Sequence, residues 1–178
     1  IMGKLQSFGK VMMIPIAAIT FASFFMGLGG AFTNSDTIKA LNLSGIINEQ
    51  TGVIYFFQIM KAAGEVVFKY LPLFFCLGAS FGLAKKEQGF AALSGAMGYL
   101  AFHTVISQIL KIQGLTADTV TVDFLKEQGM NNINAYRFNS LFTTELGIFT
   151  YKMSIFGGLF VGLITSAIHN KFYNLKLP

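Results

Sequence analysis

The chain has 178 residues, of which 53% are hydrophobic and only 12% are charged, and its mean hydropathy is +0.60. A soluble domain carries roughly twice that share of charged residues. The composition excludes a disordered chain, a basic nucleic-acid-binding module and a small disulfide scaffold, and it disfavours a water-soluble enzyme. It is typical of an integral membrane domain, and at roughly 20 residues per span the length allows four or five helices.

The first predicted span covers residues 11–32, which include no charged side chain. A run of 22 apolar residues is long enough to cross a bilayer as a helix. Residues 33–52 are polar and begin with turn-forming side chains, so we expect a loop there.

Residues 53–84 are apolar but too long for one span. As one helix they would measure about 48 Å, whereas the hydrocarbon core is about 30 Å thick. We therefore expect an amphipathic segment over 54–65 at the membrane surface and a span over 66–84. Pro72 would then lie in the first turns of the span, where a kink costs least.

Three charged side chains in this region, Lys61, Glu65 and Lys69, are spaced four residues apart and share one helical face. Glu65 could face a substrate. The interpretation that we favour is a self-neutralising face at the membrane surface.

Residues 89–110 form the third predicted span and are again uncharged. Residues 111–145 are polar, with short apolar pieces that could enter the interface. The fourth span is predicted over 146–168, with Lys152 snorkelling to the surface. The expected fold is therefore an all-α integral membrane domain with about four transmembrane helices and additional interfacial segments.

The net charge of +5 is unevenly distributed between the two predicted sides of the membrane. One side carries six lysines against one glutamate, and the other carries four basic residues against six acidic ones. The positive-inside rule assigns the lysine-rich side, and with it both termini, to the cytoplasm. The lysines on that side are Lys4, Lys10, Lys85, Lys86, Lys171 and Lys176.

Two G-x-x-x-G patterns lie within the predicted spans, Gly78/Gly82 and Gly158/Gly162. Small residues at this spacing let helix backbones approach closely. They favour a packed and potentially dimerising helical scaffold. The alternative is that they reflect the general frequency of glycine in spans.

The third span contains a polar face with Tyr99, His103 and Ser107 at intervals of four, and Thr104 and Gln108 beside it. Polar groups at membrane depth face protein or water, so Tyr99, His103, Ser107 and Gln108 could line a sugar path. An interhelical hydrogen-bond seam is the alternative, and it is the interpretation that we favour from the residues alone.

The sequence contains no self-contained catalytic constellation. It has no glycine-rich phosphate loop, and its two histidines and single cysteine, Cys76, are too far apart in sequence to indicate a metal site. We therefore predict no catalytic residue, no metal and no cofactor.

Three stretches resemble a known family: LQSFGK and MIPI near the start, GEVVF, LPLFF and GLAKK in the middle, and FGG followed by HNKFYNLKLP at the end. In this order they resemble the membrane IIC component of the sugar phosphotransferase system, in the glucose superfamily, with maltose and α-glucoside members nearest. The closing pattern is the most specific, and it supplies the predicted cytoplasmic motif residues His169, Asn170, Phe172 and Tyr173.

The resemblance implies import of a glucose-type sugar or α-glucoside that a IIB domain phosphorylates during uptake, with phosphoenolpyruvate as the ultimate donor. It implies a multi-pass protein of the bacterial inner membrane whose partners are the lipid bilayer, the sugar, IIB and a second copy in a homodimer, with no nucleic acid. Family members carry most sugar contacts in a second half, including a glutamate in a Gly-Ile-Thr-Glu motif that is absent here. Residues 1–178 are therefore expected to be the N-terminal scaffold and dimer-interface part of a IIC permease.

Two other interpretations stay open on the residues alone. One is a non-transporting membrane scaffold subunit that binds a partner through its G-x-x-x-G faces. The other is a fragment of an ion-coupled transporter, which would require an acidic residue within a span, and the three uninterrupted apolar stretches have none.

Overall fold

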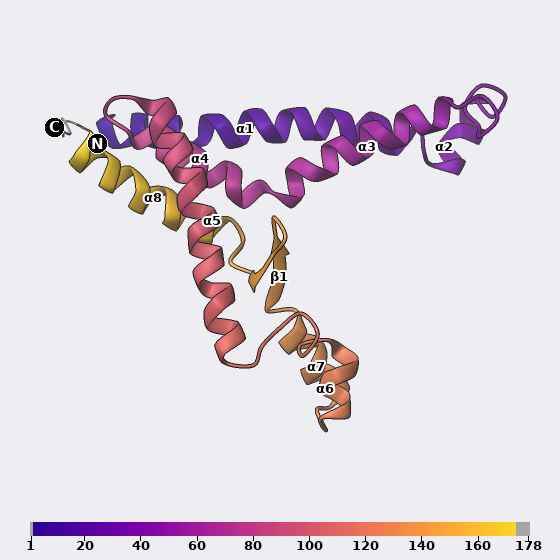
Figure 1. The fold of residues 1–178 in the computed structure, drawn as a ribbon. Coiled ribbons are helices and arrows are strands. Elements are labelled where there is room, and N and C mark those ends of the chain that lie inside the picture. Colours follow the sequence, from indigo (N-terminus) through magenta and orange to yellow (C-terminus); the bar gives the residue numbers. More distant parts are fainter. Residues whose placement is uncertain (1, 174–178) are drawn as a thin grey trace.

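The computed structural model describes residues 2–173 and is built mainly of helices (Figure 1). A single antiparallel hairpin interrupts the helical pattern between α7 and α8. The elements are α1 (Met2–Ala31), α2 (Ser35–Ala40), α3 (Val53–Lys69), α4 (Leu71–Leu83), α5 (Gln88–Ile112), α6 (Val122–Glu127), α7 (Asn132–Asn139), β1 (Phe142–Glu145), β2 (Ile148–Tyr151) and α8 (Ser154–Phe172).

Three helices are long and apolar enough to cross a membrane: α1 over Gly9–Ala31, α5 and α8. The pair α3 and α4 meets the same criteria when taken together, and it is bent by 58° at a short break. The described chain therefore has three candidate spans, or four with the bent pair. This confirms the predicted all-α membrane fold.

The break in the second span lies at Tyr70, and not at the predicted boundary between residues 65 and 66. Pro72 occupies the first turn of α4, where its missing N–H and fixed φ are compatible with a helix start. The proline thus sets the boundary, because no residue between 53 and 69 prevents a continuous helix. An expected amphipathic segment over 54–65 is in fact part of the longer α3.

The fourth span starts later than predicted. Residues 146–151 belong to the hairpin, and α8 begins only at Ser154. Only Lys152 and Met153 separate β2 from α8, so hydropathy alone does not distinguish the strand from the helix here. Lys152 lies in the connection between the two elements and not within a helix.

Short helices also occur where a loop or an irregular polar stretch was expected. Asn34 caps α2 by accepting hydrogen bonds from the backbone N–H groups of the first turn. Thr121 and Asn131 cap α6 and α7 in the same way. These caps satisfy backbone donors that a helix start leaves without partners.

The helices pack at glycine positions. A Cβ on Gly82 would come within 2.5 Å of the backbone N of Val11, and one on Gly78 would clash with the carbonyl oxygen of the same residue. These two glycines therefore hold α4 against α1. On the opposite side of α4, a Cβ on Gly158 would clash with the carbonyl oxygen of Pro72, and one on Gly162 would come within 2.6 Å of the Cys76 oxygen.

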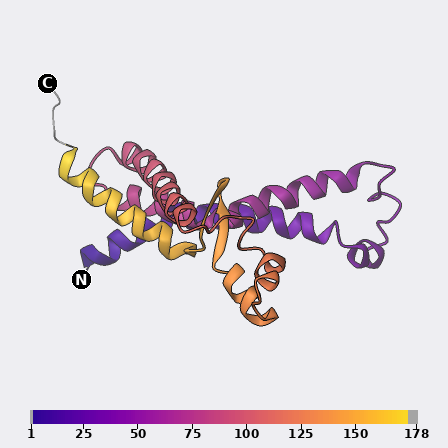
Figure 2. The ribbon, with the colours of Figure 1, turned by 60° about the horizontal axis from the view of Figure 1, so that its bottom comes forward.

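A second contact between helices uses glycines that the sequence patterns did not single out. A Cβ on Gly64 of α3 would come within 2.7 Å of the Ala22 carbonyl oxygen in α1, and one on Gly29 would come within 2.5 Å of the Lys61 backbone N. Helices α1 and α3 therefore run side by side along much of their length, as both ribbon views show (Figures 1 and 2).

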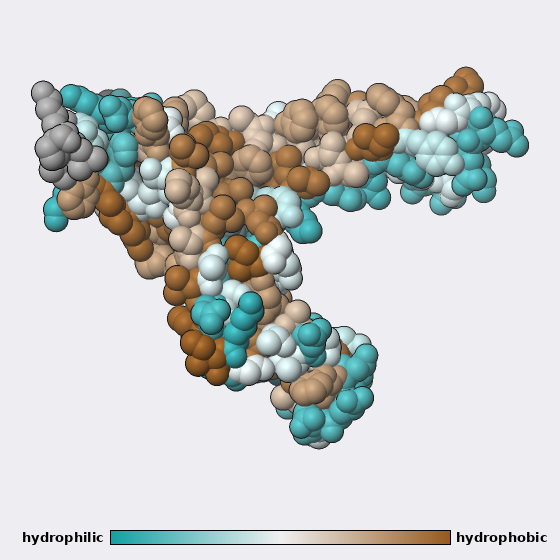
Figure 3. Space-filling view, viewed as in Figure 1, coloured by the Kyte–Doolittle hydropathy of each residue, from teal (hydrophilic) through white to brown (hydrophobic). Residues whose placement is uncertain are grey.

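The start of α1, the connection between α4 and α5, and the end of α8 lie together at one end of the molecule (Figure 1). Helices α6 and α7 lie beyond the opposite end of α5. The visible surface over α1, α3 and α5 is largely hydrophobic, whereas hydrophilic residues gather over α6 and α7 and near α2 (Figure 3).

Candidate functional site

The polar face of α5 is buried in the structure. Tyr99 is 1% exposed, His103 2% and Ser107 7%, although α5 otherwise shows large hydrophobic side chains on its surface. Their spacing of four residues places them on one side of the helix. The structure therefore brings three of the predicted path residues onto one covered face.

The hairpin covers part of this face, while Tyr99 also packs in a buried cluster with Cys76 of α4 and Val161 of α8. Glu145 pairs with Ile148, which leaves a two-residue turn of Leu146 and Gly147 with φ values of 50° and 84°. Positive φ at both turn positions is typical of the type I′ turn, whose twist matches that of the strands. The sequence TTELGIFTY carries the corresponding signal, with β-branched and aromatic residues on both sides of a turn containing Gly.

Two side-chain contacts hold the hairpin on α5. His103 Nδ1 and Thr150 Oγ1 are 3.0 Å apart, and Thr150 is fully buried. Nearer the hairpin tip, the Tyr99 hydroxyl donates a long hydrogen bond of 3.4 Å to Glu145 Oε2. The polar face thus forms a seam with a hairpin, and not with another helix. The remaining ring nitrogen of His103, Nε2, is buried without a hydrogen-bond partner.

These contacts place a partly buried carboxylate beside the middle of α5. Tyr99 is the twelfth of the 25 residues of α5, so the Glu145 side chain lies about halfway along a candidate membrane span. Sequence reasoning missed Glu145 because it assigned this residue to the end of a polar loop. Glu145 reaches the middle of α5 because it belongs to the hairpin that packs against that helix.

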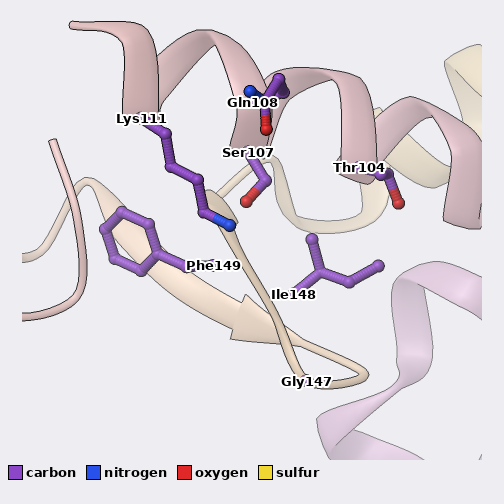
Figure 4. A pocket seen from close by; sticks show the side chains of 7 residues that line it. All are labelled: Thr104, Ser107, Gln108, Lys111, Gly147, Ile148 and Phe149. Carbon is purple, nitrogen blue, oxygen red and sulfur yellow. The ribbon is translucent and has the colours of Figure 1, made fainter. Parts of the chain in front are cut away.

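One cavity lies between α5 and the second strand, and we call it the α5 cavity (Figure 4). Its volume is about 300 Å³. The side chains of Ser107 and Lys111 point from the helix toward the hairpin, with Phe149 opposite them (Figure 4). The lining residues are Thr104, Ser107, Gln108, Lys111, Gly147, Ile148 and Phe149.

A second cavity lies beside the first strand of the hairpin, next to the break between α3 and α4, and we call it the break cavity. It measures about 250 Å³ and combines three charged side chains with hydroxyl and apolar groups. Its lining residues are Phe68, Lys69, Leu71, Pro72, Thr143, Glu145, Lys152, Ser154 and Ile155.

The charged triad of α3 does not act as one unit. Lys61 and Glu65 form an ion pair at 3.7 Å, with both side chains about half exposed. Lys69 lies one turn further on and lines the break cavity instead. An exposed ion pair of this kind contributes little to stability. Lys69 is therefore the member of the triad that can contact a ligand in a cavity.

Two residues of the predicted cytoplasmic motif form hydrogen bonds with the backbone of the connection between α4 and α5. Asn170 Nδ2 donates to the Leu83 carbonyl at 2.8 Å, and its Oδ1 accepts from the Lys85 backbone N–H at 2.7 Å. His169 Nε2 lies 2.9 Å from the Lys86 carbonyl oxygen. These bonds satisfy backbone groups at the end of a helix.

Of the two aromatic residues of this motif, Tyr173 packs against other side chains of the motif region, whereas Phe172 is exposed. The Lys86 ammonium lies 5.7 Å from the centre of the Tyr173 ring, which stacks on His169. Phe172 is 49% exposed. The rest of the closing sequence pattern, including Leu177 and Pro178, lies outside the described residues.

Within residues 2–173 no group of three or more His, Cys, Asp or Glu side chains is arranged to hold a metal ion. The polar groups of the two cavities are hydroxyls, amides, ammonium groups and one carboxylate. Such groups bind and orient a polar ligand through hydrogen bonds.

The helical spans and the polar cavities beside the hairpin define a helical membrane domain with internal binding space. The family model for the phosphotransferase system EIIC component matches residues 9–178. The match covers nearly the whole chain, and the chain belongs to this family. Members of the family are sugar permease components that work with EIIB and a sugar substrate.

Proposed function

We propose that this chain is the N-terminal scaffold part of a sugar permease that imports a glucose-type sugar or an α-glucoside while EIIB phosphorylates it. The observation that carries the proposal is the EIIC family match over residues 9–178, together with the sequence motifs of the glucose superfamily. The permease is a multi-pass protein of the bacterial inner membrane and works as a homodimer.

The polar face of α5 supplies one wall of the sugar path in this proposal. Ser107 and Gln108 line the α5 cavity and offer a hydroxyl and an amide to sugar hydroxyl groups. Tyr99 and His103 act indirectly, because their polar atoms hold the hairpin that forms the opposite wall. Phe149 adds an aromatic surface suited to the apolar face of a sugar ring.

The orientation follows from charge. The described lysines of the end formed by α1, the α4–α5 connection and α8 are Lys10, Lys85, Lys86 and Lys171. The positive-inside rule places this end in the cytoplasm, where it faces the phosphorylating partner. The His169–Tyr173 motif then stabilises the cytoplasmic surface of the scaffold.

The rival interpretation as a non-transporting scaffold gains no support. Both G-x-x-x-G patterns are occupied by helices of the chain itself, with Gly78 and Gly82 on α1 and Gly158 and Gly162 on α4. Those faces are therefore not free to recruit a partner helix.

The proposal is tested with the permease that contains this chain, expressed in cells that lack other routes for glucose and maltose. Phosphoenolpyruvate-dependent uptake of labelled glucose and maltose is measured in membrane vesicles. Substitution Gln108→Ala removes a hydrogen bond to the sugar and is expected to raise the apparent KM about tenfold.

Gln113→Ala is the matched control, because Gln113 is exposed at the end of α5 and lines neither cavity. It should leave uptake unchanged. Absence of phosphoenolpyruvate-dependent uptake of any glucose-type sugar in the unmodified permease contradicts the proposal.

A further inference from the structure

The break cavity has features of a ligand site that the α5 cavity does not share. It lies where a candidate span is broken and bent by 58°, and it contains the Glu145 carboxylate about halfway along α5. An ionisable group at membrane depth is costly, so it indicates function. Broken helices at this depth supply binding sites in many transporters, because their backbone and side chains line a polar space.

The three charged side chains that line the cavity do not form ion pairs with one another. Within residues 2–173 Lys61 pairs with Glu65, and neither Lys69 nor Lys152 forms an ion pair with Glu145. Lys69 and Lys152 are both exposed, and their ammonium groups provide compensating positive charge beside the cavity. A ligand in the cavity can therefore bridge the carboxylate and the lysines.

Tyr99 contacts the carboxylate through a long hydrogen bond of 3.4 Å. Its hydroxyl donates to Glu145 Oε2, which leaves Oε1 free of contact with Tyr99. A carboxylate accepts about four hydrogen bonds in total. Glu145 thus retains acceptor capacity toward the cavity.

The lining selects the chemical class of the ligand. An anion would meet the negative charge of Glu145, and a cation would meet Lys69 and Lys152. A neutral polyhydroxylated ring satisfies all three, because its hydroxyls both donate and accept, and Thr143 and Ser154 add two more partners. Phe68, Leu71 and Ile155 offer an apolar surface to the ring face, and about 250 Å³, equal to roughly eight water molecules, accommodates a single pyranose.

We infer that the break cavity, which is lined by the first strand of the hairpin whereas the α5 cavity is lined by the second, is a second sugar-binding site in which Glu145 accepts hydrogen bonds from a pyranose ring. The inference rests on the proposed function for its substrate class. It adds a binding residue, Glu145, that neither the sequence motifs nor the polar face of α5 indicated.

The test uses the absence of tryptophan from the 178-residue chain. In the permease that contains this chain, Phe68→Trp adds an indole in the break cavity, Phe149→Trp adds one in the α5 cavity, and Phe24→Trp adds one on the exposed surface of α1. Each variant is reconstituted in lipid nanodiscs and titrated with glucose, maltose and inorganic phosphate, and its emission is compared with that of the unmodified permease.

A saturable sugar-dependent change in the emission of the Phe68→Trp variant, with none in Phe24→Trp, supports the site. Adding Glu145→Gln should weaken the apparent affinity at least about tenfold. This substitution removes the charge but keeps an oxygen that accepts from Tyr99. The control Glu127→Gln changes an exposed carboxylate on α6 and should have no effect.

A second measurement does not depend on the indole. Thr143→Cys places a thiol in the break cavity, while the native Cys76 is fully buried. Saturating glucose or maltose should slow labelling of this thiol by a small maleimide several-fold. No emission change at position 68 and no protection at position 143 together overturn the inference.

A response to phosphate without a response to sugar, or a sugar response confined to Phe149→Trp, also overturns it. Failure of this site and failure of the proposed function are distinguishable. Phosphoenolpyruvate-dependent uptake by the permease without sugar binding in the break cavity supports the proposed function and contradicts the second site. Sugar binding in the break cavity without such uptake supports the second site and contradicts coupled transport.

Discussion

The Asn170 side chain near the end of α8 caps the C-terminus of α4, because its Nδ2 donates a hydrogen bond of 2.8 Å to the Leu83 carbonyl oxygen. The same side chain accepts from the Lys85 backbone N–H at 2.7 Å. One amide thus satisfies a donor and an acceptor on a segment more than 80 residues earlier in the chain. This contact gives a physical role to the most specific part of the closing sequence pattern.

Substitution of Asn170 by Ala should destabilise the α4–α5 connection. It leaves two backbone groups without their side-chain partner, and losing such a partner costs about 1–3 kcal/mol. The measurement is thermal unfolding in detergent micelles. Lys171→Ala, at an exposed neighbouring position, is the control. Equal midpoints for the two variants would contradict the structural role of Asn170.

Gly158 provides a second test of packing. Any side chain at this position meets the backbone carbonyl of Pro72, which cannot rotate away as a side chain can. Gly158→Ala should therefore reduce stability by at least about 2 kcal/mol or prevent assembly. The comparison is Gly27→Ala in α1, where a Cβ has no neighbour within 4 Å. If both variants unfold at the same temperature, the close approach of α4 and α8 is wrong.

The hairpin turn supports a prediction of increased stability. Leu146 adopts φ of 50°, a conformation that asparagine tolerates better than leucine. Leu146→Asn should raise the unfolding midpoint slightly, whereas Gly147→Val, at φ of 84°, should lower it. Circular dichroism melts of both variants check the pair. The opposite order would show that the two-residue turn is not formed.

Membrane orientation is testable with single thiols, because the native Cys76 is fully buried. Lys86 and Asp123 are both exposed, and they lie near opposite ends of α5. In intact cells a membrane-impermeant maleimide should label Asp123→Cys and not Lys86→Cys, because the positive-inside rule places Lys86 in the cytoplasm. The reverse labelling pattern would invert the orientation.

The spans were predictable from the sequence because uncharged apolar runs of sufficient length identify transmembrane helices on their own. The hairpin was missed although TTELGIFTY carries a turn signal, because only a short connection with Lys152 separates the apolar residues of β2 from those of α8. Ser107 and Gln108 could be placed on a cavity-facing helix from their spacing. Glu145 could not, because its depth depends on the tertiary contact with Tyr99.

We propose that this chain is the scaffold part of a coupled sugar permease and is insufficient for transport by itself. The direct measurement is uptake of labelled glucose and maltose in cells lacking other routes, with the chain expressed alone or as part of the permease, and with membrane insertion verified separately. We expect phosphoenolpyruvate-dependent uptake by the permease and none above the vector control for residues 1–178 alone. Robust phosphoenolpyruvate-dependent uptake by the chain alone would contradict it, because the principal sugar contacts would then lie within these residues.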